Sequence, residues 1–253
     1  MSAGSVRLTI DGAVATIVFD RPGMRNALSL AMYDELSVAC GRIASTPGLR
    51  ATVFRGADGA FVAGTDIAEF RGFQTGEDGV RYEARLERGV AEIEALPVPT
   101  LAVVDGPATG GGLMIATACN LRVASSRARF GAPVARTLGN CLSRANLGRL
   151  ERAFGQGRTS RMLLLADLLD ANEALAAGFL VALAEPDSLE TSVAEILGKL
   201  LANAPLTLAA TRVLMRLDSE GEEKIIARVY GSRDFKEGVE AFLAKRAPVW
   251  PGD

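Results

Sequence analysis

The stretch VDGPATGGGLMIATACNLRVAS, residues Val104–Ser125, joins a short apolar run to an amphipathic run through three consecutive glycines, Gly110, Gly111 and Gly112. This pattern predicts a strand, a tight turn and the start of a helix. Backbone N–H groups at a helix N-terminus have no intrahelical partner, and glycine lets a ligand oxygen approach them without a Cβ in the way. The turn therefore predicts an anion site or an oxyanion hole, or else a place where helix and strand pack tightly.

Neither common phosphate-binding motif fits this turn. A Walker loop ends in Gly-Lys-Ser/Thr, which is missing here, and the dinucleotide fingerprint G-x-G-x-x-G is not matched. A second stretch of the same kind, AFVAGTDIAEF (residues 60–70), runs from a strand pattern through a glycine to a predicted helix start at Thr65 and Asp66. If each turn offers one N–H, an oxygen between them has two donors, each worth ~3–4 kcal/mol to an oxyanion.

The rest of the chain predicts the α/β class. Asp11-Gly12 separates two alternating apolar runs, which indicates a hairpin. Strand patterns cover residues 51–56, 100–106 and 121–125, and helix patterns cover residues 29–46, 77–96 and 113–120. From about Ser143 helical periodicity dominates, over residues 159–179, 189–204, 205–217 and 233–250. We therefore expect an α/β core followed by a helical region.

Composition limits the classes of function. The chain has 253 residues, 49% of them hydrophobic, and a formal net charge of −2 with interspersed acidic and basic residues, so no nucleic-acid surface is expected. The sequence has no histidine, which excludes Ser-His and Cys-His dyads and an imidazole base.

The cysteines bear on compartment and on metal binding. The chain has three cysteines, an odd number, at Cys40, Cys119 and Cys141. They lie far apart in apolar stretches, and their spacing is not that of a metal site. We expect a reducing compartment, no disulfide framework and no metal. Neither a signal-peptide core nor a membrane span is recognisable, so we expect a soluble, cytoplasmic protein that does not bind membranes.

Six short segments, in order, resemble the crotonase superfamily, the enoyl-CoA hydratase/isomerase family, over essentially the whole chain. They are DRPGMRNALS (20–29), AFVAGTDIAEF (60–70), VDGPATGGGLMIATACNLRVAS (104–125), ARFGAPVA (128–135), LLDANEALAAGFL (168–180) and DFKEGVEAFLAKR (234–246). The resemblance implies a crotonase-like spiral of ββα units over residues 1–190 and a C-terminal helical trimerisation region over residues 191–253. It also implies a homotrimer or a hexamer made of two trimers.

The resemblance further implies an acyl-CoA ligand whose thioester oxygen lies between the backbone N–H groups of Thr65 and Gly111, beside Gly110. Lys245 falls where the family has a basic residue that reaches the CoA phosphates, sometimes those of a neighbouring subunit. For both Arg25 and Lys245 the alternative is a solvated surface charge. CoA would be part of the substrate, with no separate cofactor. The residues implied along its adenine and pantetheine are Arg25, Ala27, Ala63, Asp66 and Ile67.

This chain departs from the family where hydratases carry their two glutamates. Met114 and Val134 occupy those positions, so a water between them has neither a base nor an acid. Since such groups each contribute 10²–10⁴-fold in general, ordinary hydration should be very slow. The isomerases of the family need at least the second glutamate. Asn120 replaces a family aspartate at a position that we expect to be structural.

Other family members carry an acid in the loop that here spans residues 136–146. This loop contains no carboxylate, but Asn140, Cys141, Ser143 and Arg144 make it polar. Ser143 and Cys141 are candidate catalytic groups. The alternatives are a helix N-cap for Ser143 and a small buried hydrophobe for Cys141.

Two acids follow the oxyanion turn directly. We expect Asp66 to cap its helix, while Glu69 faces either the acyl pocket or solvent. Met114, Val134, Leu138 and Leu142 suggest an apolar acyl pocket. The favoured hypothesis is an enzyme that stabilises a thioester enolate, with isomerisation, hydrolysis or decarboxylation as possible reactions. A non-catalytic acyl-CoA-binding homologue is the alternative, and fold alone does not decide the reaction.

Overall fold

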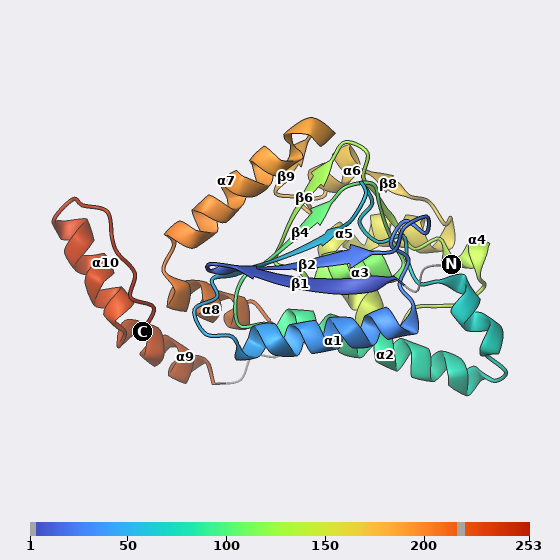
Figure 1. Ribbon diagram of the computed structural model, residues 1–253, viewed down its shortest axis with the longest axis horizontal. Helices are drawn as coiled ribbons and strands as arrows, with labels where there is room; N and C mark the ends of the chain where they lie inside the picture. Colours follow the sequence, from blue (N-terminus) through green and yellow to red (C-terminus); the bar gives the residue numbers. More distant parts are fainter. Residues whose placement is uncertain (1–3, 217–220) are drawn as a thin grey trace.

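A computed structural model describes residues 4–216 and 221–253 (Figure 1). The chain opens with an antiparallel hairpin, β1 (Ser5–Asp11) and β2 (Val14–Asp20). Gly12 in the connection has a φ of 53°, a left-handed backbone conformation that glycine adopts without a steric penalty. The hairpin expected at this point is confirmed.

A six-stranded sheet in the order β1-β2-β3-β4-β6-β9 runs through the core. Beyond the hairpin, all neighbouring strands in it are parallel. Its other strands are β3 (Ala51–Gly56), β4 (Thr100–Val104), β6 (Leu121–Ser125) and β9 (Ala182–Ala184). Every residue of β4 is buried, because a central parallel strand is covered on both faces.

Helices cover both faces of this sheet (Figure 1). Phe54 and Ala102 point to one face, into the larger apolar cluster, whereas Val53 and Leu101 point to the other face, into a smaller cluster. Neighbouring residues of a strand thus serve opposite layers, as the two-residue period of a strand requires. The helices are α1 (Leu30–Ser45), α2 (Gly76–Ala95) and α3 (Gly111–Ala118) on the first face and α7 (Leu189–Ala202) on the second.

A second, three-stranded sheet in the order β5-β7-β8 positions the glycine turn. Its strands are β5 (Pro107–Thr109), β7 (Arg129–Gly131) and β8 (Leu169–Asp170). β5 comes shortly after β4 and leads into α3, and β7 comes shortly after β6 and leads into α4 (Val134–Thr137). This recurring order of strand, strand and helix confirms the spiral of ββα units that the resemblance implies.

The single helix expected over residues 159–179 is wrong. α5 (Arg144–Leu164) ends inside that range, Ala166 has a φ of 55°, and β8 and α6 (Ala171–Ala176) follow. Leu169 pairs with Phe130 in the small sheet, a contact that the local apolar spacing does not reveal. β9 is a second strand in the region expected to be helical.

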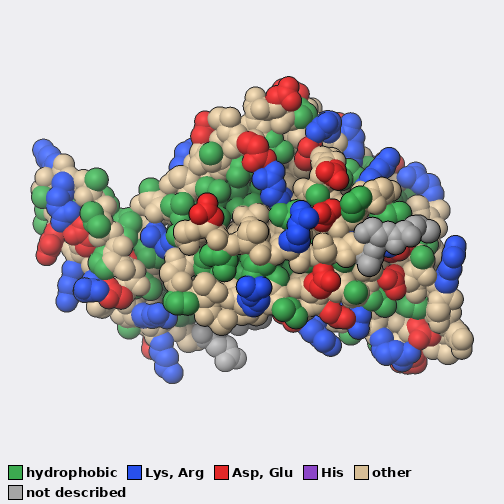
Figure 2. All heavy atoms as spheres, viewed as in Figure 1, with side chains coloured by type: hydrophobic (Ala, Val, Ile, Leu, Met, Phe, Trp, Pro, Cys, Tyr) green, Lys and Arg blue, Asp and Glu red, His purple; other side chains and the backbone are tan. Residues whose placement is uncertain are grey.

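The C-terminal helices form an arm. Figure 1 shows α9 and α10 extending away from the core, and Figure 2 shows a notch between this arm and the rest of the molecule. The helices after α7 are α8 (Pro205–Leu214), α9 (Glu222–Tyr230) and α10 (Arg233–Leu243), and the short η2 (Pro186–Ser188) leads into α7. α9 has no counterpart among the expected helices, and Leu217, at the end of one expected helix, lies outside the described residues.

Among the described residues, no single helix is long and apolar enough to cross a bilayer. Only the bent pair Pro186–Ala202 and Pro205–Leu214 passes by length and composition, when its two halves are taken together.

A buried arginine ties α5 to α2. Arg149, 8% exposed, donates from Nη1 and Nη2 to the carboxylate of Glu87 at 2.7 and 2.8 Å, and from Nε and Nη2 to that of Glu94 at 2.8 Å. Both carboxylates keep some contact with solvent, whereas the guanidinium has almost none. Removing the arginine would leave two carboxylates facing each other without a counter-charge.

We therefore expect Arg149→Ala to lower the free energy of unfolding by about 3 kcal/mol. Arg81→Ala is the matched control, because Arg81 pairs with Asp78 at the exposed start of the same helix α2. That variant should lose less than about 0.5 kcal/mol. Urea unfolding followed by circular dichroism compares the two, and equal losses would contradict a structural role for the Arg149 ion pairs.

Candidate active site

The two glycine turns lie side by side. Val62, just before the second turn, forms a parallel bridge with Ala108 in the strand that precedes the first. A Cβ built on Gly111 would lie 3.4 Å from the Oγ1 of Thr65. The structure thus brings together Thr65 and Gly111, which belong to separate turns in the sequence.

The backbone N–H groups of Thr65 and Gly111 are not used in the hydrogen bonding of the described elements. Gly111 is the first residue of α3, where an N–H has no intrahelical acceptor. Thr65 sits in a one-residue bridge with Leu28, and the flanking residues make the hydrogen bonds of that bridge. Within the described chain neither N–H donates to a protein acceptor. Two such donors can share one oxygen.

Each of the three glycines has its own structural reason. Gly110 has a φ of 50°, which strains any other residue. A Cβ on Gly111 would overlap the hydroxyl of Tyr33, and a Cβ on Gly112 would overlap the backbone oxygen of Val62. Tight packing therefore explains Gly112, while Gly111 combines close packing with a free N–H group.

A row of three hydroxyl groups lies against this turn. The Thr65 Oγ1 is 2.7 Å from the Tyr33 Oη and 2.7 Å from the Tyr82 Oη. Burial, followed by the neighbouring Tyr82, raises the pKa of Tyr33 well above its usual value, and burial also raises the pKa of Tyr82. The rings of Phe70 and Phe73 pack against Tyr82. The hydroxyls therefore stay neutral and act as hydrogen-bonding groups.

Sequence reasoning missed Tyr33 and Tyr82. Tyr33 lies on α1 one turn after the N-cap Ser29, on the face that carries the buried Met32 and Leu36. A phenol on the apolar face of an amphipathic helix needs a polar partner when buried, and that was the available signal. Nothing in the sequence showed that the partner is Thr65.

The predicted CoA-binding segments run alongside each other. The N–H of Ala63 donates to the oxygen of Arg25 at 3.1 Å, and the N–H of Asp66 donates to the oxygen of Leu28 at 2.8 Å. Arg25 is exposed with a φ of 47°. The structure thus brings the predicted residues into two adjacent segments, Arg25 and Ala27 in one and Ala63, Asp66 and Ile67 in the other. Ala27 is buried, whereas Ile67 is exposed.

Asp66 and Glu69 are occupied by structural contacts. Asp66 caps the short η1 helix (Ile67–Gly72) by accepting from the N–H of Ala68, and it pairs with Arg21 at 2.7 Å. These two contacts, the N–H first, lower its pKa. The capping role expected for Asp66 is confirmed. Glu69 accepts from the N–H of Leu30 at 3.2 Å, so it serves the start of α1.

Lys245 lies apart from the other predicted CoA-binding residues. It is exposed just beyond α10, with a φ of 53°. Figure 1 places α10 at the opposite end of the molecule from α4, which follows the glycine-turn strands. Within one chain the structure does not bring Lys245 to the segment around Arg25.

Met114 and Val134 flank the glycine turn. Gly110 donates to the oxygen of Gly131 at 3.0 Å and accepts from the N–H of Met114 at 3.1 Å. Val134 follows three residues after Gly131 and begins α4, and Met114 is fully buried. Both apolar residues therefore lie near the turn, where neither provides an acid or a base.

The two candidate groups in the loop at residues 136–146, Ser143 and Cys141, lie in different surroundings. The Ser143 hydroxyl accepts from the N–H of Asn146 at 3.3 Å, so the expected N-cap of α5 is confirmed. Cys141 is exposed, which contradicts both the apolar setting and the buried alternative given to it. Leu142 packs on the main core, whereas Leu138 is more exposed.

Glu83 on α2 is a second residue that sequence reasoning missed. Its carboxylate accepts from the backbone N–H of Ser143 at 2.9 Å. Burial, despite that hydrogen bond, raises its pKa, and the charge of Glu87 contributes further. Its own charge also raises the pKa of Tyr33 and of Tyr82. The structure thus brings a carboxylate to the hydroxyl row and to the loop that contains none.

Asn120 has the structural role expected for it. Its Oδ1 accepts from the backbone N–H and the hydroxyl of Thr100, both at 3.0 Å, and from Arg212 at 2.6 Å. The side chain thereby joins the start of β4 to α8. It does not contribute to the chemistry of the glycine turn.

The remaining thiols and acids offer no further chemistry at this site. Cys40 and Cys119 are buried, and burial raises the pKa of each to about 12. Among the described residues no group of three His, Cys, Asp or Glu side chains has the arrangement of a metal site.

Comparison with known proteins connects this geometry to one family. The sequence model described as "Enoyl-CoA hydratase/isomerase" matches residues 9–253. The short-chain-enoyl-CoA hydratase of Clostridium acetobutylicum is 31% identical over 97% of both chains, and a probable enoyl-CoA hydratase of Bacillus subtilis is 32% identical over 98% of this chain and 99% of its own. The crystal structure of an enoyl-CoA hydratase/carnithine racemase from Magnetospirillum magneticum superposes with a TM-score of 0.92 at 30% identity, covering 100% of this chain and 97% of that one.

The overlap between a Gly111 side chain and the Tyr33 hydroxyl is testable by a double-mutant cycle. We expect Gly111→Ala to destabilise the protein by about 2–3 kcal/mol, because the new methyl group meets the phenol oxygen. In the Tyr33→Phe background the same change should cost about 1 kcal/mol less. Denaturant unfolding of the four proteins measures the coupling, and additive losses would contradict the contact.

Proposed function

This chain belongs to the enoyl-CoA hydratase/isomerase family, and from that premise we propose that it acts on the thioester of an acyl-CoA through an oxyanion hole formed by the N–H groups of Thr65 and Gly111. The observation that carries this proposal is the pair of unpartnered N–H groups on adjacent turns. Such donors stabilise the negative charge that develops on the thioester oxygen when an enolate forms. CoA enters as part of the substrate, and the proposed chemistry uses no separate cofactor.

The proposed reaction is not ordinary hydration. Several curated relatives are named enoyl-CoA hydratases, but Met114 and Val134 are both apolar beside the turn. Double-bond isomerisation, hydrolysis and decarboxylation of an acyl-CoA all pass through charge on the same oxygen. The hydroxyl of Ser143 and the thiol of Cys141 stay candidate groups for these reactions, although the first is engaged as a helix cap.

We propose that CoA lies along the edge formed by Arg25, Ala27, Ala63, Asp66 and Ile67, with Gly110 beside the thioester and with Met114 and Val134 lining the acyl pocket. Lys245 is too far along the chain's own arm to join them, so we assign it to the CoA phosphates bound by a neighbouring subunit. That assignment requires a homo-oligomer, a trimer or a dimer of trimers.

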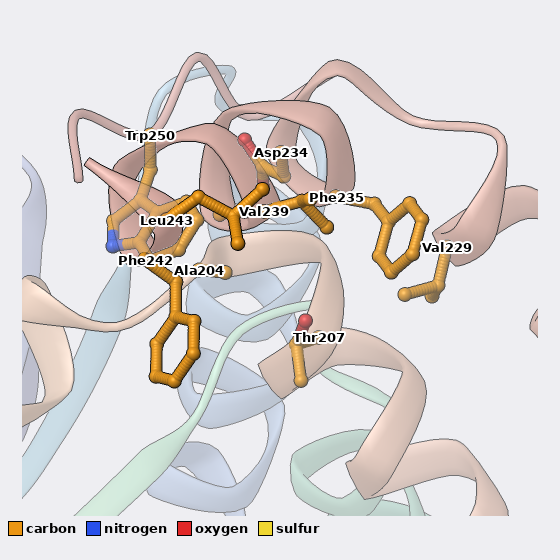
Figure 3. A pocket seen from close by; sticks show the side chains of 10 residues that line it. Ala204, Thr207, Val229, Asp234, Phe235, Val239, Phe242, Leu243 and Trp250 are labelled. Carbon is orange, nitrogen blue, oxygen red and sulfur yellow. The ribbon is translucent and has the colours of Figure 1, made fainter. Parts of the chain in front are cut away.

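The C-terminal arm has the surface that such an assembly needs. A cleft of about 410 Å³ between α8, α9 and α10 is lined mostly by apolar side chains (Figure 3). Phe242 at its rim is 83% exposed, and Leu243, which also lines the cleft, is exposed as well. Contiguous exposed apolar surface of this kind marks protein interfaces, and a second copy of the chain is the occupant that the family precedent supports.

The second candidate function is a homologue that binds acyl-CoA without turning it over. The absence of acids at positions 114 and 134 favours it. The two functions differ in turnover, since both predict binding of a CoA thioester and only the first predicts its conversion.

Restoring the missing acids tests the proposed pocket. We expect purified protein to bind crotonyl-CoA but to hydrate it very slowly, and Met114→Glu with Val134→Glu to raise the hydration rate by ~10²-fold or more. The matched control is Met114→Gln with Val134→Gln, which has the same shape without an acid. Loss of enoyl-thioester absorbance measures the rate, and calorimetry measures binding.

Two results would contradict this account. Fast hydration by the unmodified chain would mean that other groups replace the glutamates. Failure to bind any acyl-CoA, with the fold intact by circular dichroism, would overturn the proposed function itself.

The proposed assembly gives a separate prediction. Phe242→Ser should weaken self-association by about 2–3 kcal/mol per interface, because a buried aromatic side chain is lost from each contact. Val80→Ser, at an exposed apolar residue on α2, is the control. Light scattering across a dilution series measures the mass, and a Phe242→Ser protein that dissociates like the control would contradict the role of the arm.

A further inference from the structure

The proposed enolate chemistry needs a group that takes a proton from carbon and gives it back. Met114 and Val134 cannot do so, and the loop at residues 136–146 has no carboxylate. The following inference rests on the proposed function and names the group that fills this role.

Most carboxylates around the turn are already neutralised. Asp66 is paired with Arg21, and Glu69 serves the first N–H of α1. On α2, Glu87 is paired with Arg149. Glu83 differs, because no arginine or lysine among the described residues forms an ion pair with it.

We propose that the carboxylate of Glu83 is the catalytic base of this site, removing a proton from the carbon next to the thioester carbonyl and returning it to the carbon skeleton. Its position supports this role. Glu83 directly follows Tyr82, whose hydroxyl bonds to Thr65, and α2 packs against α3, which begins at the glycine turn. The Glu83 carboxylate also meets the start of α5, where it accepts from the Ser143 N–H at 2.9 Å, and its charge raises the pKa of both Tyr33 and Tyr82.

The surroundings of Glu83 suit a group that changes protonation state. The groups facing it are Tyr33 from α1, Tyr82 and Glu87 on its own helix, and the Ser143 N–H and Asn146 side chain from α5. A single backbone N–H at a helix N-terminus orients the carboxylate without fixing its charge as an arginine would. Burial raises its pKa, and a raised pKa favours a carboxyl that both accepts and donates a proton in the reaction.

The step conserves atoms and electrons. The C–H bond next to the carbonyl breaks, its proton forms an O–H bond on Glu83, and its electron pair becomes the C=C bond of the enolate, with charge on the oxygen held by Thr65 and Gly111. In the reverse sense the O–H bond breaks and a C–H bond forms, at the same carbon or two carbons further along an unsaturated chain. One carboxyl suffices for this shuttle. It therefore fits migration of a double bond in a 3-enoyl-CoA, with no water added.

Hydrogen exchange tests the base without requiring that the natural reaction be known. Butanoyl-CoA in D₂O should gain deuterium next to its carbonyl when the unmodified protein is present, as followed by NMR. Glu83→Gln keeps the shape and the acceptor for Ser143, and it should slow the exchange by ~10²-fold or more. Glu77→Gln, at an exposed glutamate in the first turn of the same helix, should exchange like the unmodified protein. Binding of butanoyl-CoA, measured by calorimetry, should be the same in all three.

The pH dependence gives a second readout that needs no variant. A base must be ionised to act, so exchange should fall as the pH drops through the pKa of Glu83. Because that pKa is raised, the fall should come at a higher pH than for an exposed glutamate. Glu83→Asp should retain part of the exchange rate, and that rate should also fall as the pH drops.

The outcomes separate this inference from the proposed function. Binding with exchange that survives Glu83→Gln, or binding with no exchange by the unmodified protein, overturns Glu83 as the base and leaves the CoA site standing. If Glu83→Gln fails to fold, the pH profile of the unmodified protein decides instead. An exchange rate that does not fall once as the pH drops would overturn Glu83 as the base. Absence of binding overturns the proposed function first.

Discussion

The close approach of α3 to the strand before the second glycine turn is the constraint on which the rest of the site depends. Gly112 lies against the backbone oxygen of Val62, with no room for a Cβ. Pairing of β5 with β7, and the bridge from Val62 to Ala108, hold both turns at that separation. The first N–H of α3 consequently points beside Thr65. A wider separation of these elements would leave two isolated donors rather than a pair.

Hydroxyl groups surround that pair. Three neutral oxygens, from Tyr33, Thr65 and Tyr82, are linked at 2.7 Å next to the turn, and the nearby Met114 and Val134 are apolar. Partial burial raises the pKa of Glu83, whereas Asp66 and Glu87, which are paired with arginines, serve as structural links.

The helices of the C-terminal region do not all belong to the arm. α7 completes the main sheet with Leu189 and Val193, whereas α9 and α10 extend beyond it and expose Phe242. Acidic and basic side chains alternate over the face shown in Figure 2, so charge does not mark one region for a partner there. The apolar cleft of the arm in Figure 3 is the stronger feature, and the proposed assembly would use it.

The sequence by itself determined the α/β class, the hairpin, the helix caps at Asp66 and Ser143 and the two glycine turns, because local periodicity and capping residues act within a few positions along the chain. It also determined, through ordered motifs, the family. Only the tertiary structure decided that the helix α5 ends at Leu164, since the strand β8 that follows exists only by pairing with β7. It likewise decided the hydroxyl row and the contact from Glu83 to Ser143, which lie 60 residues apart. Side chains from different helices meet only when those helices pack, and no local pattern encodes that meeting.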